Sequence, residues 1–329
     1  MRIFKDLFRN IIIFVFVILF FAIVTFINNS FDKPYTQIRT TIPVSASNND
    51  VNTLDISFDD TIVYKNDDSN SNLFDDCYYA LLIDDTDKNV YVSKNIYKRM
   101  YPASMTKIMT AMIVLDKVND KSISLDDVVT VEHYYDLTSE GVLPSELTPG
   151  CKITVKDLLY TLLIKSNNYY ALILADYVAG SEESFCELMN QKAISLGATG
   201  THFSNPHGLD DVDHYTTAYD MYLILKAAHD YEEIKAIDSF ESYNYFYYNS
   251  SGTPIEMDID PTNLFMTGDV LLPANYNIEV WKTGTTDGAG NCLAMFLTRD
   301  EKEYVLVASA GESRALLYDA IVAMLSMVK

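Results

Sequence analysis

Residues 101–111 read YPASMTKIMTA, and this segment is the strongest indication of the fold that the chain adopts. Pro102 precedes a run over 103–116 in which apolar residues recur at helical spacing, so the pattern predicts a helix. Ser104 then falls in the first turn, and Lys107, three residues later, shares its face. From there the lysine amine can take the proton of the serine hydroxyl. The segment therefore predicts a nucleophilic serine with a lysine as its base.

Two further motifs follow in chain order. Ser166-Asn167-Asn168 lies between two helical patterns, and Lys282-Thr283-Gly284 lies on a predicted strand before a Gly-rich turn over 285–290. No single motif is specific, because S-x-x-K also occurs at 30–33 and 326–329. The ordered combination of S-x-x-K, S-x-N and K-T-G is the set found in β-lactamases and penicillin-binding proteins. The specificity comes from the three together.

Longer stretches carry a resemblance to a known family. Residues 101–111 resemble the active-site segment of low-molecular-mass, serine-type D-alanyl-D-alanine carboxypeptidases. The similarity runs from about Cys77 to Arg314 and includes LLIKSNNYYALILADYVAGSEESFCELMN (162–190), THFSNPHGLDD (201–211), HYTTAYDM (214–221) and WKTGTTDGAGNCLA (281–294). The resemblance implies hydrolysis of the terminal D-Ala-D-Ala bond of peptidoglycan stem pentapeptides, release of D-alanine and inhibition by β-lactams. It implies no metal and no cofactor.

The resemblance also implies roles for the matching residues. Ser104 would attack the carbonyl of the penultimate D-alanine, with Lys107 as general base, and Ser166 would pass a proton to the leaving amine. Asn168 would bind a substrate carbonyl. The K-T-G strand would bind the terminal carboxylate of the substrate and set the electrostatic potential of the site, through Lys282, Thr283, Gly284 and Thr285. His207 and Asp220 are expected to hold these groups in position without contacting the substrate.

Elementary electrostatics is consistent with this division of roles. Two lysines close together in a partly desolvated cleft disfavour each other's charge, which lowers the pKa of Lys107 toward that of a working base. Lys282 would keep the positive charge that a substrate carboxylate needs. The chain departs from the commonest family pattern at Asn167 and Tyr169, where many members have glycine and aspartate.

The remaining periodicity predicts the fold class. Residues 78–84 and 90–93 read as a hairpin, residues 154–197 as a mainly helical region and residues 220–229 as a helix. Strands are predicted at 278–283, 291–299 and 303–310, followed by a helix over 313–328. Together these elements predict a three-layer α/β fold. Its antiparallel sheet would be flanked by helices and carry a mainly helical subdomain, as in the β-lactamase and transpeptidase fold.

The first 72 residues predict a membrane tether. Residues 11–27 form an almost unbroken apolar run, preceded by Arg2, Lys5 and Arg9, which favours a signal-anchor with its positive end inside. Residues 1–10 would be a cytoplasmic tail, 28–72 a polar extracytoplasmic stalk, and 73–329 the catalytic domain. A cleaved signal peptide is the alternative. Both interpretations place the catalytic domain outside the cytoplasm, and the anchor would make it a single-pass protein of the cell membrane.

The composition of the chain excludes some classes of binding partner and of catalytic metal. A formal net charge of −22 without clustered basic residues argues against nucleic acid. The five histidines include no H-E-x-x-H pair, so a zinc peptidase is rejected. The four cysteines lack C-x-x-C spacing and are interpreted as free thiols, with a disulfide as the alternative in an extracytoplasmic setting. A monomer is expected.

Three alternatives share this fold. A β-lactamase usually needs an extra glutamate to position water, in an E-x-x-x-N pattern, but Glu187 and Asn190 are three apart rather than four. A D,D-endopeptidase would differ only in what lies beyond the scissile bond, which the sequence does not decide. A catalytically silent wall-binding scaffold would lack the catalytic groups, and all of them are present.

Overall fold

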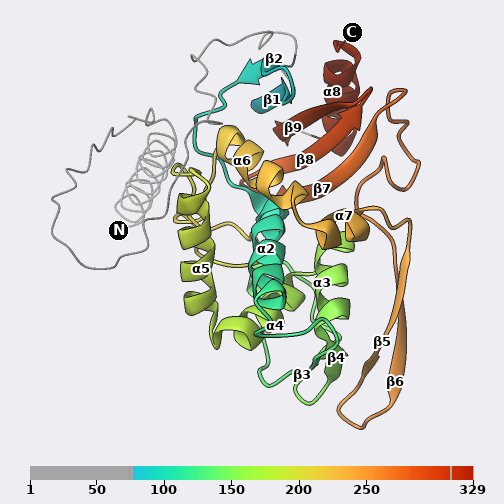
Figure 1. Ribbon diagram of the computed structural model, residues 1–329. Coiled ribbons are helices and arrows are strands. Elements are labelled where there is room, and N and C mark those ends of the chain that lie inside the picture. The colour runs from blue at the N-terminus through green and yellow to red at the C-terminus, as the bar shows by residue number, and fades with distance from the viewer. Residues whose placement is uncertain (1–73, 75–76, 312, 329) are drawn as a thin grey trace, which may run out of the picture. The chain divides into compact units, whose positions relative to one another are not determined.

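The structure is a computed structural model that describes residues 74, 77–311 and 313–328 (Figure 1). The predicted tail, anchor and stalk, at 1–10, 11–27 and 28–72, lie outside the described residues. Within the ranges just given, no helix is both long enough and apolar enough to cross a membrane.

A five-stranded antiparallel sheet forms the centre of the domain. Its strands run in the order β2 (Asn89–Lys94), β1 (Tyr79–Asp84), β9 (Lys302–Gly311), β8 (Gly290–Arg299) and β7 (Asn277–Thr286). The predicted hairpin and the three predicted C-terminal strands are confirmed. β8 is buried along its middle because it is covered on both faces, which explains its nearly continuous apolar run.

Helices cover both faces of this sheet, as Figure 1 shows. On one face α8 (Arg314–Ser326) packs Leu317 and Ile321 into a cluster with Trp281 and Met295. On the other face lie α6 (Ala218–His229) and the buried helix α2 (Thr106–Asn119). The predicted three-layer fold is confirmed.

The helical subdomain contains α3 (Val155–Ile164), α4 (Asn168–Ala179) and α5 (Glu182–Ser195), with α7 (Glu232–Asp238) beside β7. Thr154, Asn167 and Ser181 cap the first three helices by accepting a main-chain N–H of the first turn. The cap at Asn167 fixes where α4 begins. It thereby places Asn168 at the first position of that helix.

A second sheet was not predicted. Its four strands run in the order β3 (Val128–Thr130), β4 (Lys152–Thr154), β5 (Tyr243–Tyr248) and β6 (Pro254–Ile259). A short 3-10 turn, η3 (Thr138–Glu140), lies between β3 and β4. This small antiparallel sheet lies at the far end of the helices (Figure 1), and its strands come from residues before and after the region predicted to be helical.

The segment around Ser104 differs from the prediction in detail. Ser104 lies in the 3-10 turn η2 (Ala103–Met105), and the α-helix starts only at Thr106 and runs three residues further than predicted, to Asn119. Ala103 has φ +47°, a left-handed conformation that costs an alanine free energy. The expected α-helical first turn is therefore a strained corner that exposes Ser104 at the end of a buried helix.

Candidate active site

The hydroxyl of Ser104 and the amine of Lys107 are in contact. Lys107 Nζ lies 2.8 Å from Ser104 Oγ, although Lys107 is fully buried in the first turn of α2. It also lies 2.6 Å from Oδ1 of Asn168 and 2.5 Å from the main-chain oxygen of His207. A neutral amine has two N–H groups and one lone pair, so it can donate to Asn168 and His207 and accept from Ser104. That is the arrangement of a general base.

Burial and a like charge both favour the neutral amine. The pKa of Lys107 lies well below its usual value because the side chain is desolvated and because Lys282 is nearby. Lys107 is therefore neutral at a lower pH than a solvated lysine, and the neutral amine can accept the proton of Ser104.

The predicted groups from three distant segments meet at one cleft of about 310 Å³. Ser104, Ser166 and Asn168 line it from the helical side, and Thr283 and Thr285 line it from β7. Ser166 occupies the corner between α3 and α4 with φ +66°. The complete lining is Ser104, Ser166, Asn168, Thr262, Thr283, Gly284, Thr285, Asn291, Cys292, Arg314, Leu317 and Tyr318.

Gly284 allows β7 to approach the nucleophile closely. A Cβ at this position would lie 2.9 Å from Cβ of Ala103 and 3.0 Å from the main-chain nitrogen of Ser104. The strand therefore packs directly on η2, next to the main-chain nitrogen of Ser104.

Lys282 lies beneath this edge of the cleft. Its side chain is fully buried, and its Nζ donates to the main-chain oxygen of Thr283 at 3.3 Å. Burial lowers the pKa of Lys282 to about 7, while the negative charge of Asp238 opposes that shift. Asp238 is not among the site residues predicted from the sequence.

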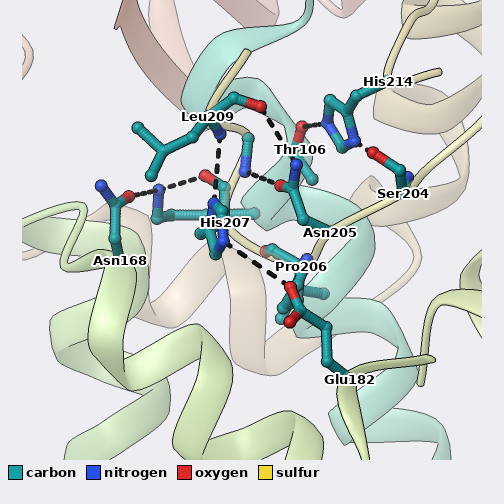
Figure 2. A network of polar contacts seen from close by, with 12 residues as sticks. Thr106, Asn168, Glu182, Ser204, Asn205, Pro206, His207, Leu209 and His214 are labelled. Atoms are coloured by element: carbon teal, nitrogen blue, oxygen red, sulfur yellow. Dashed lines mark hydrogen bonds and ion pairs between the residues drawn. The ribbon is translucent and has the colours of Figure 1, made fainter. Parts of the chain in front are cut away.

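His207 supports Lys107 through its main-chain oxygen, and its ring contacts Leu209 and Glu182 (Figure 2). Its Nδ1 accepts the N–H of Leu209 at 3.2 Å, so the ring proton is on Nε2, which faces Oε1 of Glu182 at 3.7 Å. Burial, followed by the charge of Lys107, lowers the pKa of His207 well below its usual value. The ring is therefore neutral and structural, and the carbonyl is the part that touches the base.

A second histidine ties the same loop to α2 (Figure 2). His214 Nδ1 accepts the N–H of Ser204 at 3.1 Å, so its Nε2–H donates to Oγ1 of Thr106 at 2.8 Å. Thr106 directly follows the η2 turn, so this bond helps to fix the loop against the nucleophile segment.

The structure places Asp220 away from the cleft lining. Its carboxylate accepts the hydroxyl of Thr201 at 2.7 Å, and its own N–H donates to the side chain of Thr217 at the start of α6. Burial raises the pKa of Asp220 to about 6. A supporting role in catalysis stays a prediction for this residue.

Several cleft residues had no motif to mark them. Thr262 and Asn291 come from a loop and a strand start. Arg314 is exposed at the start of α8, and from the sequence it could equally bind a substrate carboxylate or be a solvated charge. In the structure its guanidinium donates to the carbonyl of Thr262. Thr262 Oγ1 in turn lies 2.5 Å from Oγ1 of Thr283.

Glu187 and Asn190, the two residues considered for a β-lactamase, lie outside the cleft. Asn190 on α5 donates to the main-chain oxygen of Phe203 at 2.9 Å and accepts its N–H at 2.8 Å, and Glu187 is exposed. Asn190 therefore holds the loop that leads to His207. Neither residue lines the cleft.

A serine, a buried lysine within reach of its hydroxyl, and a second lysine under a K-T-G strand are the groups that serine acyl-transfer enzymes of this class use. Comparisons with known proteins agree with this class. The chain belongs to the peptidase S11 family, described as D-alanyl-D-alanine carboxypeptidase, whose family model matches residues 72–311.

Two relatives and one solved structure illustrate the similarity. The chain is 37% identical over 217 residues to D-alanyl-D-alanine carboxypeptidase DacF of Bacillus subtilis, covering 65% of this chain and 52% of that one. It is 34% identical over 244 residues to DacC of Escherichia coli, covering 73% and 58%. The crystal structure of the Streptomyces K15 DD-transpeptidase superposes with a TM-score of 0.68 at 24% identity, covering 76% and 95%. The chain thus spans little more than half the length of these curated relatives.

Proposed function

We propose that this protein is a serine-type D-alanyl-D-alanine carboxypeptidase that removes the terminal D-alanine from peptidoglycan stem peptides. The observation that carries the proposal is the 2.8 Å contact between Lys107 Nζ and Ser104 Oγ in a cleft that also holds the K-T-G strand. Membership of the family supports the choice of substrate.

The reaction would follow from the positions of the side chains. Lys107 takes the proton of Ser104, whose Oγ attacks the penultimate carbonyl, while the N–H groups of Ser104 and Thr285 stabilise the oxyanion. Ser166 relays this proton from Lys107 to the leaving D-alanine amine. Water then hydrolyses the acyl ester, which releases the shortened peptide and restores the Ser104 hydroxyl. A β-lactam would acylate the same oxygen. The groups near β7 would hold the carboxylate that both kinds of ligand carry.

The membrane tether belongs to this proposal as well. The apolar run over 11–27 with basic residues before it supports a single-pass anchor that leaves the catalytic domain outside the cytoplasm, where its polymer substrate lies. Fractionation of cells, with protease protection of the catalytic domain as the readout, tests this part separately.

The activity is tested with purified full-length chain and a pentapeptide that ends in D-Ala-D-Ala. We expect release of one D-alanine per peptide, and none from Ser104→Ala. If wall fragments bind but no D-alanine appears, the protein is a scaffold. If only cross-linked dimers are cleaved, it is an endopeptidase. Rapid recovery of unmodified enzyme after penicillin would identify a β-lactamase.

A further inference from the structure

A buried carboxylate outside the predicted site lies next to the K-T-G lysine. Asp238, the last residue of α7, is 1% exposed. Its Oδ2 accepts the main-chain N–H of Trp281 at 2.7 Å, and its main-chain oxygen accepts the indole N–H of Trp281 at 2.9 Å. Trp281 immediately precedes Lys282 on β7, which is an edge strand of the five-stranded sheet. The end of α7 is therefore fastened to the strand beside the lysine.

The second carboxylate oxygen is what makes Asp238 unusual. Oδ1 has no hydrogen-bond partner among the described residues, although it is fully buried. A buried carboxylate with an unsatisfied oxygen is costly unless an opposite charge compensates it. Lys282 is the positive charge that acts on Asp238, and it is also fully buried. Among the described residues its Nζ forms one hydrogen bond, to the oxygen of Thr283 at 3.3 Å.

We propose that Asp238 is the internal counter-ion of Lys282, a positioning residue whose carboxylate keeps the Lys282 ammonium charged for the carboxylate of the substrate. The inference rests on the proposed function, because it assigns the pair to recognition of the C-terminal carboxylate. Asp238 does not touch the substrate and acts only through Lys282.

The charges around the pair agree with this assignment. Burial lowers the pKa of Lys282 and raises that of Asp238, and in each case the charge of the other residue opposes the shift, so each residue favours the charged form of the other. Lys107 on α2 and Arg314 on α8, the other charged side chains at the cleft, are basic and cannot replace Asp238. On α6, His229 stacks on Phe296.

The rest of α7 does not supply a counter-charge either. Lys235 forms an ion pair with Glu232 at 2.7 Å, and Glu233 accepts the hydroxyl of Tyr160 at 2.6 Å. Glu233 is therefore a matched control, since Glu233→Gln removes one negative charge from the same helix and leaves an oxygen for Tyr160.

The first test compares Asp238→Asn with wild type and Glu233→Gln by following release of D-alanine from pH 5.5 to 9. Asparagine keeps an oxygen for Trp281 but removes the charge. We expect the alkaline limb of kcat/KM to move to lower pH in Asp238→Asn, with a loss of about tenfold at pH 7.5 carried mainly by KM. Glu233→Gln should follow wild type. An unchanged profile in folded Asp238→Asn would overturn the proposal.

The second test uses the only tryptophan in the chain and needs no activity. Because Asp238 accepts both N–H groups of Trp281, we expect the fluorescence of wild type to change with pH near neutrality. In Lys282→Met the loss of the positive charge should move that transition to higher pH. A wild-type trace without a transition, or an unmoved one in Lys282→Met, contradicts the pairing. If instead wild type releases no D-alanine but the fluorescence behaves as expected, the proposed function fails and the ion pair stands.

Discussion

A Cβ atom on Gly208 would lie 1.9 Å from the main-chain oxygen of Ala103, so the loop that carries His207 rests directly on the turn that carries Ser104. Gly208 also has φ +91°, a conformation that side chains rarely adopt. This close approach brings the His207 oxygen to Lys107 and completes the surroundings of the base.

Gly208→Ala should therefore damage both stability and activity. The added methyl group meets main-chain atoms that cannot move without displacing η2, so we expect a loss of at least about 3 kcal/mol in the free energy of unfolding. Acylation by penicillin should be strongly slowed. The control is Gly252→Ala, which has φ +80° but no neighbouring atom within 4 Å, and which should cost only about 1 kcal/mol. Equal effects of the two variants, measured by denaturant unfolding, would contradict the packing argument.

Lys107→Met should separate chemistry from folding. Methionine fills much of the same space but cannot take the proton of Ser104, so acylation should slow by about 10² to 10⁴-fold. Lys165→Met is the control, because Lys165 is an exposed lysine close in sequence to Ser166 that does not line the cleft. Stopped-flow measurement of penicillin acylation gives the comparison, and similar rates for both variants would remove Lys107 from the role of base.

The pH dependence of turnover follows from the two lysines. Because the pKa of Lys107 is held well below its usual value, its amine becomes a base at a lower pH than a solvated lysine does. The pKa of Lys282 is about 7, so its ammonium is lost as the pH rises further. We expect kcat/KM for D-alanine release to be higher at pH 7 than at pH 10. A steady tenfold rise per pH unit up to pH 10 would mean that Lys107 titrates normally.

Asp220 should leave a signature in stability. Burial raises its pKa from 3.8 to about 6, so the folded chain binds its proton more tightly than the unfolded chain. The stabilising contribution is complete below pH 3.8 and is lost as the pH rises through 6. Asp220→Asn lacks this pH-dependent contribution. Its free energy of unfolding, relative to that of wild type, should therefore rise by about 1.5 kcal/mol between pH 5 and pH 8. A constant difference in urea unfolding at the two pH values would argue that Asp220 titrates normally.

The main sheet could be predicted because β1 and β8 carry long apolar runs that are buried on both faces. The second sheet was missed because its strands lack a clear pattern. In β5 the side chains of Tyr245 and Tyr247 point inward while Phe246 and Tyr248 are half exposed. Aromatic residues on both faces hide the alternation of period two that identifies a strand with one solvated face. The burial of β5 depends on Tyr170, whose hydroxyl meets that of Tyr245 at 2.9 Å from another part of the chain.

The motif residues of the site could be predicted because short spacings fix them locally. Lys107 reaches Ser104 within one turn, and the K-T-G residues share one strand. Asp238, Gly208 and Thr262 could not be found this way, because each owes its place to a contact across the fold. The left-handed Ala103 was also invisible, since the approach of Gly208 and Gly284 imposes that corner and no local preference does.

The most direct measurement of the central claim is the intact mass of the full-length chain after incubation with benzylpenicillin. We expect an increase equal to the mass of one penicillin molecule in wild type, with the label on the peptide that contains Ser104, and no increase in Ser104→Ala. A stable adduct that persists in Ser104→Ala, or a label on another residue, would contradict it.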